Sequence, residues 1–296
     1  MIRSKGFSLV ELAVALFIIA LLLAGALVPL SSQIDVRNAA ETQRNMESIR
    51  DAIIGFAQAT GRLPCPASGA TPAGTVDTTT WATPVAAGAE QWNPAVGANT
   101  CYTFVGVLPW TTLAMPETDG WGRRFTYRVS QVFADGNAAV TWSTTAPAPQ
   151  TQPCNPIPVP APPTTFALCS LGNIAVFTRG GTNTTATPLG TALPAVVISH
   201  GKNGFGGWQT TGIQVSPLPV GNDEAANVNG NTQATPSGGY LSWAYYSRTR
   251  TPAASGCVDP VPGTTNGAPP CEFDDIVMMI PSSALIARMV AAGRLP

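Results

Sequence analysis

Charged side chains are scarce in this chain. Asp, Glu, Lys and Arg together make up 10% of its 296 residues, and the formal net charge is −1, whereas about a quarter of the residues in an average soluble domain are charged. There is no basic excess that could neutralise a phosphate backbone and no run of acids typical of a charged tail. The composition therefore gives no indication of nucleic-acid binding.

The usual signatures of enzymes and zinc proteins are also missing. The chain has a single histidine, His200, and no CxxC pair, so a zinc site is not expected. It contains no phosphate-binding loop, dinucleotide fingerprint, HExxH or GxSxG motif. A catalytic triad would need His200, whose neighbour Ser199 is too close in sequence to be an obvious nucleophile. We therefore expect no catalytic residues, no cofactor-binding residues and no enzymatic activity.

The most informative stretch lies near the N-terminus. Residues 7–30 are apolar or small except for one acid, Glu11, and as a helix they would be long enough to cross a hydrocarbon layer of about 30 Å. Arg3 and Lys5 precede this run, so the positive-inside rule places the N-terminus in the cytoplasm and the rest of the chain outside. The pattern predicts a transmembrane helix.

Two simple explanations leave part of this stretch unexplained. Ala24-Gly25-Ala26 is similar to the cleavage site of a secretory signal, but the apolar run is longer than a typical signal core and contains an acid. A plain membrane anchor explains the length and not Glu11, because a carboxylate inside a bilayer costs a few kcal/mol.

A third explanation accounts for every residue. The segment from Gly6 to Glu11, G-F-S-L-V-E, resembles the processing site of type IV pilins and of the pseudopilins of type II secretion. The resemblance implies that a prepilin peptidase cuts between Gly6 and Phe7 and that Phe7 is then N-methylated. It also implies that Glu11 pairs with the Phe7 amine of a neighbouring subunit, since a buried carboxylate needs a cation.

A long helix is expected to continue beyond the apolar run. Pro29 would remove one hydrogen bond and kink it. Residues 31–62 carry an apolar stripe at three- and four-residue steps, formed by Met46, Ile49, Ile53 and Phe56. The pattern therefore predicts an amphipathic continuation that packs on a globular partner and ends near Gly61.

Residues 63–296 are expected to form a β-rich globular domain in the periplasm. Short apolar runs predict strands at 103–108, 124–129, 138–142, 174–178, 195–199, 240–247 and 275–280. Residues 66–99 and 146–165 have the composition of low-complexity loops. Residues 281–296 predict a short amphipathic helix, capped by Ser282 or Ser283, with Leu285, Met289 and Val290 on its apolar face. The expected fold is α+β, with a long N-terminal helix packed on an antiparallel sheet, as in pilins; residues 1–6 would be the leader.

The six cysteines are predicted to form disulfides. An even number of cysteines in an exported chain favours this, although six allow fifteen pairings. We prefer pairs of sequence neighbours, namely Cys65–Cys101, Cys154–Cys169 and Cys257–Cys271.

Calcium is the one ion that the resemblance to pseudopilins suggests. The stretch from Thr118 to Val129 resembles a pseudopilin turn of the form Asp-x-Trp-Gly followed by an aromatic strand, in which Asp119 would accept bonds from backbone amides and Gly122 would take a positive φ. Some pseudopilins bind calcium through loop carboxylates. The candidate ligands are Asp119, Asp274 and Asp275, with Asp135, Asp223 and Glu224 as further acids of suitable chemistry. Such acids more often cap turns.

The resemblance implies a structural subunit of a type IV pilus or type II secretion pseudopilus. The long inserts and six cysteines favour a minor subunit. Expected partners are the prepilin peptidase, an inner-membrane assembly platform, other subunits and the membrane, before the chain moves from the inner membrane to a filament. The alternative is a membrane-anchored periplasmic binding protein, adhesin or hydrolase acting on sugar or peptide.

Overall fold

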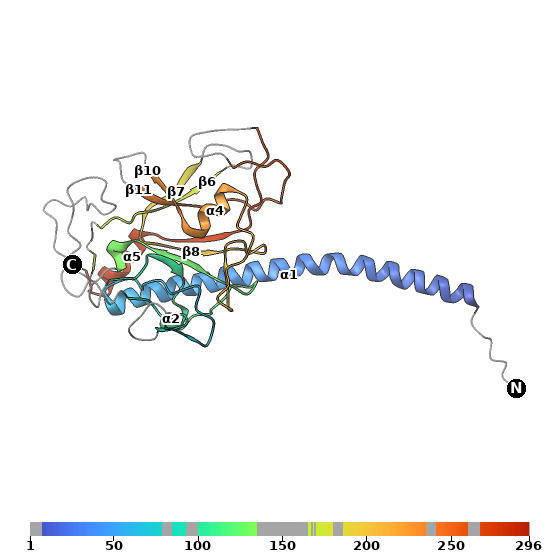
Figure 1. Ribbon diagram of the computed structural model, residues 1–296, viewed down its shortest axis with the longest axis horizontal. Coiled ribbons are helices and arrows are strands. Elements are labelled where there is room, and N and C mark those ends of the chain that lie inside the picture. The colour runs from blue at the N-terminus through green and yellow to red at the C-terminus, as the bar shows by residue number, and fades with distance from the viewer. Residues whose placement is uncertain are drawn as a thin grey trace.

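The computed structural model describes residues 8–78, 85–92, 100–134, 165–166, 168, 170–179, 186–234, 241–259 and 267–295. Its longest element is helix α1, which spans Leu9–Thr60 and ends at Gly61 with φ 81°. Half of this helix packs against the globular part and the other half extends away from it (Figure 1). The long helix predicted from the sequence is confirmed, and Gly61 ends it because glycine takes a left-handed backbone without steric cost.

Two four-stranded sheets form the framework of the described globular part. The first has the order β12-β8-β5-β3 and is antiparallel throughout; its strands are Ile276–Ile280, Ala195–Ser199, Thr126–Val129 and Val105–Val107. The second has the order β10-β11-β6-β7, with strands Asn231–Ala234, Leu241–Tyr246, Ile174–Thr178 and Thr187–Leu193. In the second sheet β6 and β11 run parallel, so the predicted antiparallel arrangement has one exception.

Smaller elements complete the described part of the fold. Two short antiparallel pairs join β1 to β2 and β4 to β9, with bounds Val76–Asp77, Val85–Ala86, Arg123–Arg124 and Trp208–Gln209. Four further helices are α2, α3, α4 and α5, at Trp110–Leu113, Gln131–Ala134, Asn222–Asn229 and Ser282–Ala291.

The main core lies between α1 and the first sheet. Met46, Ile49 and Ile53 of the predicted apolar stripe are almost completely buried there, and Phe56 packs against the same cluster. Alternate residues of β8 point to opposite sides: Val197 faces α1, whereas Val196 belongs to a second cluster with residues of β6 and β11. The first sheet is therefore sandwiched between α1 and the second sheet, as strand periodicity requires.

Part of the predicted loop at 66–99 is ordered by one buried side chain, Arg124. Its guanidinium donates to the carbonyls of Gly69 and Thr71 at 2.8 Å each and pairs with Glu117 at 2.7 Å. These bonds hold the chain against the end of β4. The described residues 66–78 and 85–92 of the predicted low-complexity loop are thus mostly loop with defined contacts, and they include the two-residue strands β1 and β2. The predicted loop at 146–165 and the strand at 138–142 lie outside the described residues, apart from Thr165.

The C-terminal helix α5 docks on the end of α1. Arg294 donates to the Gln58 carbonyl at 2.7 Å and to the Ala59 carbonyl at 2.6 Å, and Gln58 donates to the Arg288 carbonyl at 3.1 Å. The last turn of α1 has no basic residue of its own, so Arg294 supplies both the missing donors and the charge that a helix C-terminus favours.

Two details of α5 differ from the prediction. Its N-cap is Pro281, which has no side-chain capping bond. The helix begins at Ser282, one residue earlier than a Ser282 cap and two residues earlier than a Ser283 cap would place its start. Leu285 and Met289 are fully buried, but Val290 is 44% exposed. Val290 therefore lies outside the apolar face.

Candidate functional site

The processing segment leads directly into the first turn of α1. Ser8 is the N-cap: its hydroxyl accepts from the Val10 amide at 3.3 Å, while its own amide donates to the Glu11 carboxylate at 2.9 Å. This reciprocal arrangement is a capping box, which satisfies amides that a helix start would otherwise leave unpaired. Glu11 therefore has a role within its own chain. The pattern S-x-x-E at residues 8–11 would have revealed it in the sequence.

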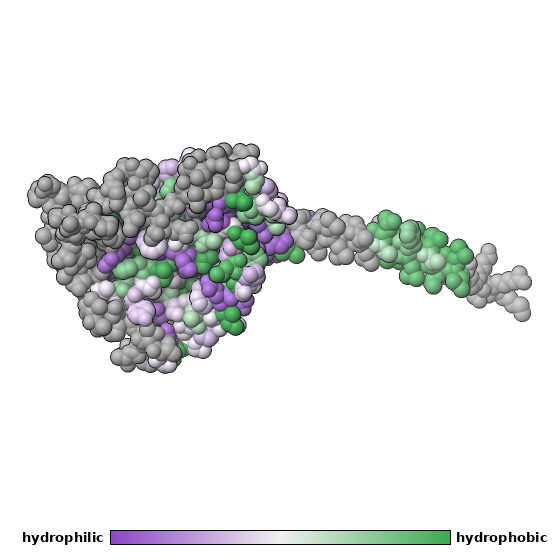
Figure 2. Space-filling view, turned by 45° about the horizontal axis from the view of Figure 1, so that its top comes forward, coloured by the Kyte–Doolittle hydropathy of each residue, from purple (hydrophilic) through white to green (hydrophobic). Residues whose placement is uncertain are grey.

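The arm of α1 beyond the capping box presents apolar side chains on all sides. Leu9 is 86% exposed, Phe17 68% and Leu21 61%, and Figure 2 shows the described outer part of this arm as hydrophobic. Among the described residues, no helix is both long and apolar enough to cross a membrane. Side chains exposed on every face of one helix need a partner outside this single chain.

The remaining residues of the predicted processing site lie outside the described part of the chain. These are Arg3, Lys5, Gly6 and Phe7. The backbone of α1 is helical through Pro29 without interruption. The predicted kink at that residue stays a prediction.

Asp119 organises the turn between Thr118 and β4. One carboxylate oxygen accepts from the amides of Trp121 and Arg123, each at 2.9 Å, and the other accepts from the Ser199 hydroxyl. Gly122 has φ 79°. The predicted roles of Asp119 and Gly122 in this turn are confirmed. Burial raises the pKa of Asp119 above its ordinary value, against the lowering effect of these hydrogen bonds.

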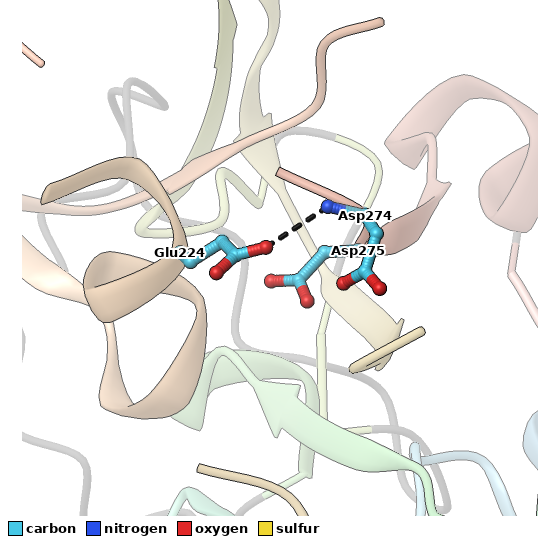
Figure 3. A group of neighbouring side chains, drawn as sticks. All are labelled: Glu224, Asp274 and Asp275. Carbon is cyan, nitrogen blue, oxygen red and sulfur yellow. Dashed lines mark hydrogen bonds between the residues drawn. The ribbon is translucent and has the colours of Figure 1, made fainter. Parts of the chain in front are cut away.

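Three other acids meet at the edge of the first sheet. Glu224 comes from the first turn of α4, and Asp274 and Asp275 immediately precede β12 (Figure 3). One oxygen from each carboxylate lies within 4.8 Å of the other two. The structure thus brings together the predicted ligands Asp274 and Asp275, adds Glu224, and leaves Asp119 in its separate turn.

Hydrogen bonds from two backbone amides and one side-chain amide hold the three acids in place. The Asp274 amide donates to Glu224 at 2.9 Å, the Asn203 amide donates to Asp274 at 2.9 Å, and the Asn227 side chain donates to Asp275 at 2.8 Å. Glu224, Asp274 and Asp275 are 2%, 9% and 7% exposed. The carboxylates are therefore both buried and oriented.

The electrostatics of this cluster are those of like charges removed from water. Burial, reinforced by the charge of Asp275, raises the pKa of Glu224 to about 8. Burial also raises the pKa of Asp274. Both shifts have the direction expected when a carboxylate loses its hydration and faces another carboxylate.

His200 lies next to these acids and is fully buried. One ring nitrogen, Nε2, is 2.8 Å from the Thr126 hydroxyl, and the other, Nδ1, is 3.7 Å from Asp275. It lies at the end of β8, where it joins the first sheet to the acidic cluster. The ring thus lies between Thr126 of β5 and Asp275, which directly precedes β12.

Two of the three predicted disulfides are present. Cys65 is bonded to Cys101 and Cys257 to Cys271. The third predicted pair, Cys154–Cys169, lies outside the described residues.

Comparison with known proteins identifies one segment of the chain. Residues 1–27 match the family model described as the prokaryotic N-terminal methylation motif. No curated protein and no solved structure shows a significant match to the chain. The match contains Gly6, Phe7 and Glu11, on which the resemblance to pilins depends. The chain therefore carries the prepilin-type signal of type IV pilins and pseudopilins, followed by an α+β domain.

Proposed function

We propose that this protein is a minor pilin or pseudopilin, cut by a prepilin peptidase between Gly6 and Phe7 and assembled into a type IV pilus or a type II secretion pseudopilus. The observation that carries this proposal is the methylation motif at residues 1–27, continuous with a helical arm whose apolar side chains are exposed on all sides. A signal of this kind without such an arm would provide nothing for a filament core to bury.

The arm is proposed to have two successive environments. Before assembly, residues 7–30 lie in the inner membrane with the leader in the cytoplasm and the globular domain in the periplasm, as Arg3 and Lys5 favour. During assembly, an inner-membrane platform transfers the arm into contact with the arms of other subunits. Both environments cover the same apolar surface, so the transfer requires little net change in hydrophobic burial.

Glu11 is proposed to set the position of each subunit against its neighbour. Its carboxylate lies at the start of the exposed arm, where the capping box holds it. Cleavage after Gly6 would create a positive amine on Phe7, one residue before the helix cap. A carboxylate within an apolar helix bundle is stable only beside such a cation.

The proposal is tested by co-expressing the full-length chain with a prepilin peptidase. We expect the wild-type chain to lose its first six residues only when the peptidase is present, and the Gly6→Ala variant to stay uncut. Ser4→Ala changes a leader residue away from the cleavage site and is expected to be cut normally. An uncut wild-type chain, or a Gly6→Ala variant cut as efficiently as wild type, would contradict the proposal.

A further inference from the structure

The exposed arm of α1 leaves the domain beside two loops that are fixed to the helix. The Lys202 ammonium donates to the Asp35 carboxylate at 2.8 Å, and the Gly120 amide donates to the Thr42 hydroxyl at 3.0 Å. Residues 35–42 of α1 therefore mark the level at which the domain ends and the arm begins. Figure 1 shows the arm leaving from this end of the domain.

Exposed apolar side chains lie on the loops at this end. A cavity of about 160 Å³ beside the acidic cluster is lined in part by Phe205, Val220 and the disulfide-bonded Cys257 and Cys271. Phe205 belongs to the same loop as Lys202, so Val220 lies at the arm end of the domain. Val220 is 85% exposed and Leu218 is 60% exposed. Neither side chain is covered by the described part of the chain.

The apolar surface continues from these loops onto α1. Ile34 is 51% exposed and Val36 is 70% exposed, on either side of the Asp35 contact. Figure 2 shows hydrophobic residues on the domain surface next to the place where the arm leaves. Single exposed apolar residues are ordinary on a soluble protein, but a group of them beside a longer apolar surface marks an interaction site.

The position of this end along α1 identifies the partner. The proposed function places residues 7–30 in the hydrocarbon of a membrane. A helix rises 1.5 Å per residue, so Asp35 lies about 7 Å beyond residue 30. The headgroup layer on each side of the hydrocarbon is about 5–7 Å thick. The loop that contains Lys202 therefore lies at the surface of the membrane that holds the arm.

Polar and aromatic groups at this end suit a headgroup layer. Trp121 belongs to the turn that Gly120 fixes to α1, and tryptophan is enriched at membrane surfaces. Arg123 donates to the Trp121 carbonyl at 2.9 Å and forms no ion pair within the described part of the chain. Lys202 is half-exposed. Both cations can donate to lipid phosphates, which are strong acceptors.

We propose that this end of the domain docks on the periplasmic surface of the membrane that holds the arm. The membrane-facing surface is formed by residues 34–36, 120–123, 202–205 and 218–220. Leu218 and Val220 insert among the lipid headgroups, while Arg123 and Lys202 contact the phosphates. This inference rests on the proposed function, because it requires residues 7–30 to lie in a membrane.

The contact can be weak and still be occupied, because the arm keeps the surface at the membrane. Tethering makes the second attachment intramolecular and so raises its effective concentration. The arm alone would allow the domain to tilt and to rotate about the helix axis, whereas the contact at Leu218 and Val220 fixes its orientation. A subunit docked in this way presents one defined face to its assembly partners.

The test uses the full-length chain in nanodiscs of phosphatidylethanolamine and phosphatidylglycerol. A photoreactive benzophenone amino acid replaces Leu218 or Val220, one position at a time, and mass spectrometry identifies what is linked after irradiation. We expect lipid adducts at both positions. The same label in place of Leu21, in the arm, is the positive control for membrane insertion.

Leu168 provides the matched control in the domain. It is a leucine that is 50% exposed, and it lies three residues after Thr165, whose amide donates to the Gly61 carbonyl at the opposite end of the domain. We expect severalfold less lipid adduct there than at position 218 or 220. Lipid adducts at position 168 in equal yield would overturn the proposal.

The label also distinguishes the other outcomes. Lipid adducts at position 21 but none at 218 and 220 would overturn the docking and leave the proposed membrane location standing. No lipid adduct at position 21 would contradict the membrane location and the docking together. Links from 218 and 220 to a second copy of the chain in place of lipid would show a subunit interface and so overturn the proposal.

A charged substitution tests whether the apolar side chains cause the docking. Val220 is 85% exposed, so Val220→Asp is expected to leave the fold intact. It is expected to lower the yield of lipid adducts at position 218 severalfold, because a carboxylate is unfavourable among headgroups and acyl chains. Leu168→Asp is expected to leave that yield unchanged. An unchanged yield in Val220→Asp would contradict the insertion of this loop.

Discussion

Glu11 combines a local role with the role proposed for it between subunits. In the single chain its carboxylate accepts from the Ser8 amide at 2.9 Å and closes the first turn of α1. Glu11 therefore stabilises the start of α1 before any neighbouring subunit is present. The capping bond also fixes the carboxylate in the first turn of α1, four residues after the Phe7 terminus that cleavage would produce.

Substitutions at Glu11 separate these two roles. Glu11→Gln keeps an oxygen that can accept from the Ser8 amide but removes the charge, whereas Glu11→Ala removes both. We expect both variants to be processed normally and both to be lost from the filament fraction, because the ion pair and not the cap determines assembly. Recovery of processed chain in sheared filaments measures this.

Glu47→Ala is the matched control, since Glu47 is an exposed acid on the same helix. It is expected to assemble like wild type. Normal assembly of Glu11→Gln would show that capping alone is required.

Helix α5 shows what an element gains from docking on another element. Leu285 and Met289 bury their side chains in the core that α1 and the first sheet share, and Arg294 caps α1 with two bonds to its last carbonyls. The C-terminus of the chain thus stabilises the C-terminal end of its first helix. The apolar face of α5 is narrower than its sequence suggests, because Val290 faces solvent.

Two alanine substitutions on α5 test this docking. Leu285→Ala is expected to lower the free energy of unfolding by about 2–5 kcal/mol, because it removes a fully buried side chain and leaves a cavity. Val290→Ala removes a similar side chain from a half-exposed position and is expected to cost less than about 1 kcal/mol. Chemical denaturation of the full-length chain in detergent measures both. Equal losses would contradict the docking seen here.

The elements that could be predicted from the sequence are those that carry their own pattern. Strands β6 and β8 have the predicted bounds, 174–178 and 195–199, because continuous runs of β-branched and apolar residues end at turn residues. Helix α4 was missed because its sequence, NDEAANVN, has no apolar stripe; it is held by long-range bonds such as that from Asn227 to the Tyr246 carbonyl. Strand β7 was missed because Pro188 and Gly190 lie within it.

The acidic cluster of Glu224, Asp274 and Asp275 shows the same limit of prediction from sequence. Asp274 and Asp275 were candidates because their carboxylates have the chemistry of calcium ligands, but nothing in the local sequence distinguishes Glu224 from Asp223. Their different surroundings depend on Arg179 and Arg248, which approach α4 from separate parts of the chain. Sequence chemistry could therefore supply candidate ligands, whereas tertiary packing decides which of them meet.

The whole molecule combines an exposed apolar arm with a domain held by disulfides. Cys65–Cys101 lies in the core beside α1, and Cys257–Cys271 lies beside the cavity next to the acidic cluster. Disulfides are typical of chains folded in an oxidising compartment. They are thus consistent with the periplasmic location proposed for the domain.

A peptide map under non-reducing conditions tests the pairing of all six cysteines. We expect linked peptides for Cys65–Cys101 and Cys257–Cys271, as the structure has them, and for the predicted pair Cys154–Cys169. Reduction is expected to lower the melting temperature of the full-length chain. The two disulfides join cysteines that are 14 and 36 residues apart, and breaking them increases the conformational freedom of the unfolded state. Peptides linking cysteines of different predicted pairs would contradict the arrangement.

The central claim concerns the N-terminus of the mature chain, and mass spectrometry of the N-terminal peptide tests it most directly. The chain is to be isolated from cells that contain a prepilin peptidase, and its first peptide identified by fragmentation. The account predicts a peptide that begins at Phe7 and carries an N-methyl group. A peptide that retains Met1, or one that begins at Leu27 after the Ala24-Gly25-Ala26 site, would contradict it.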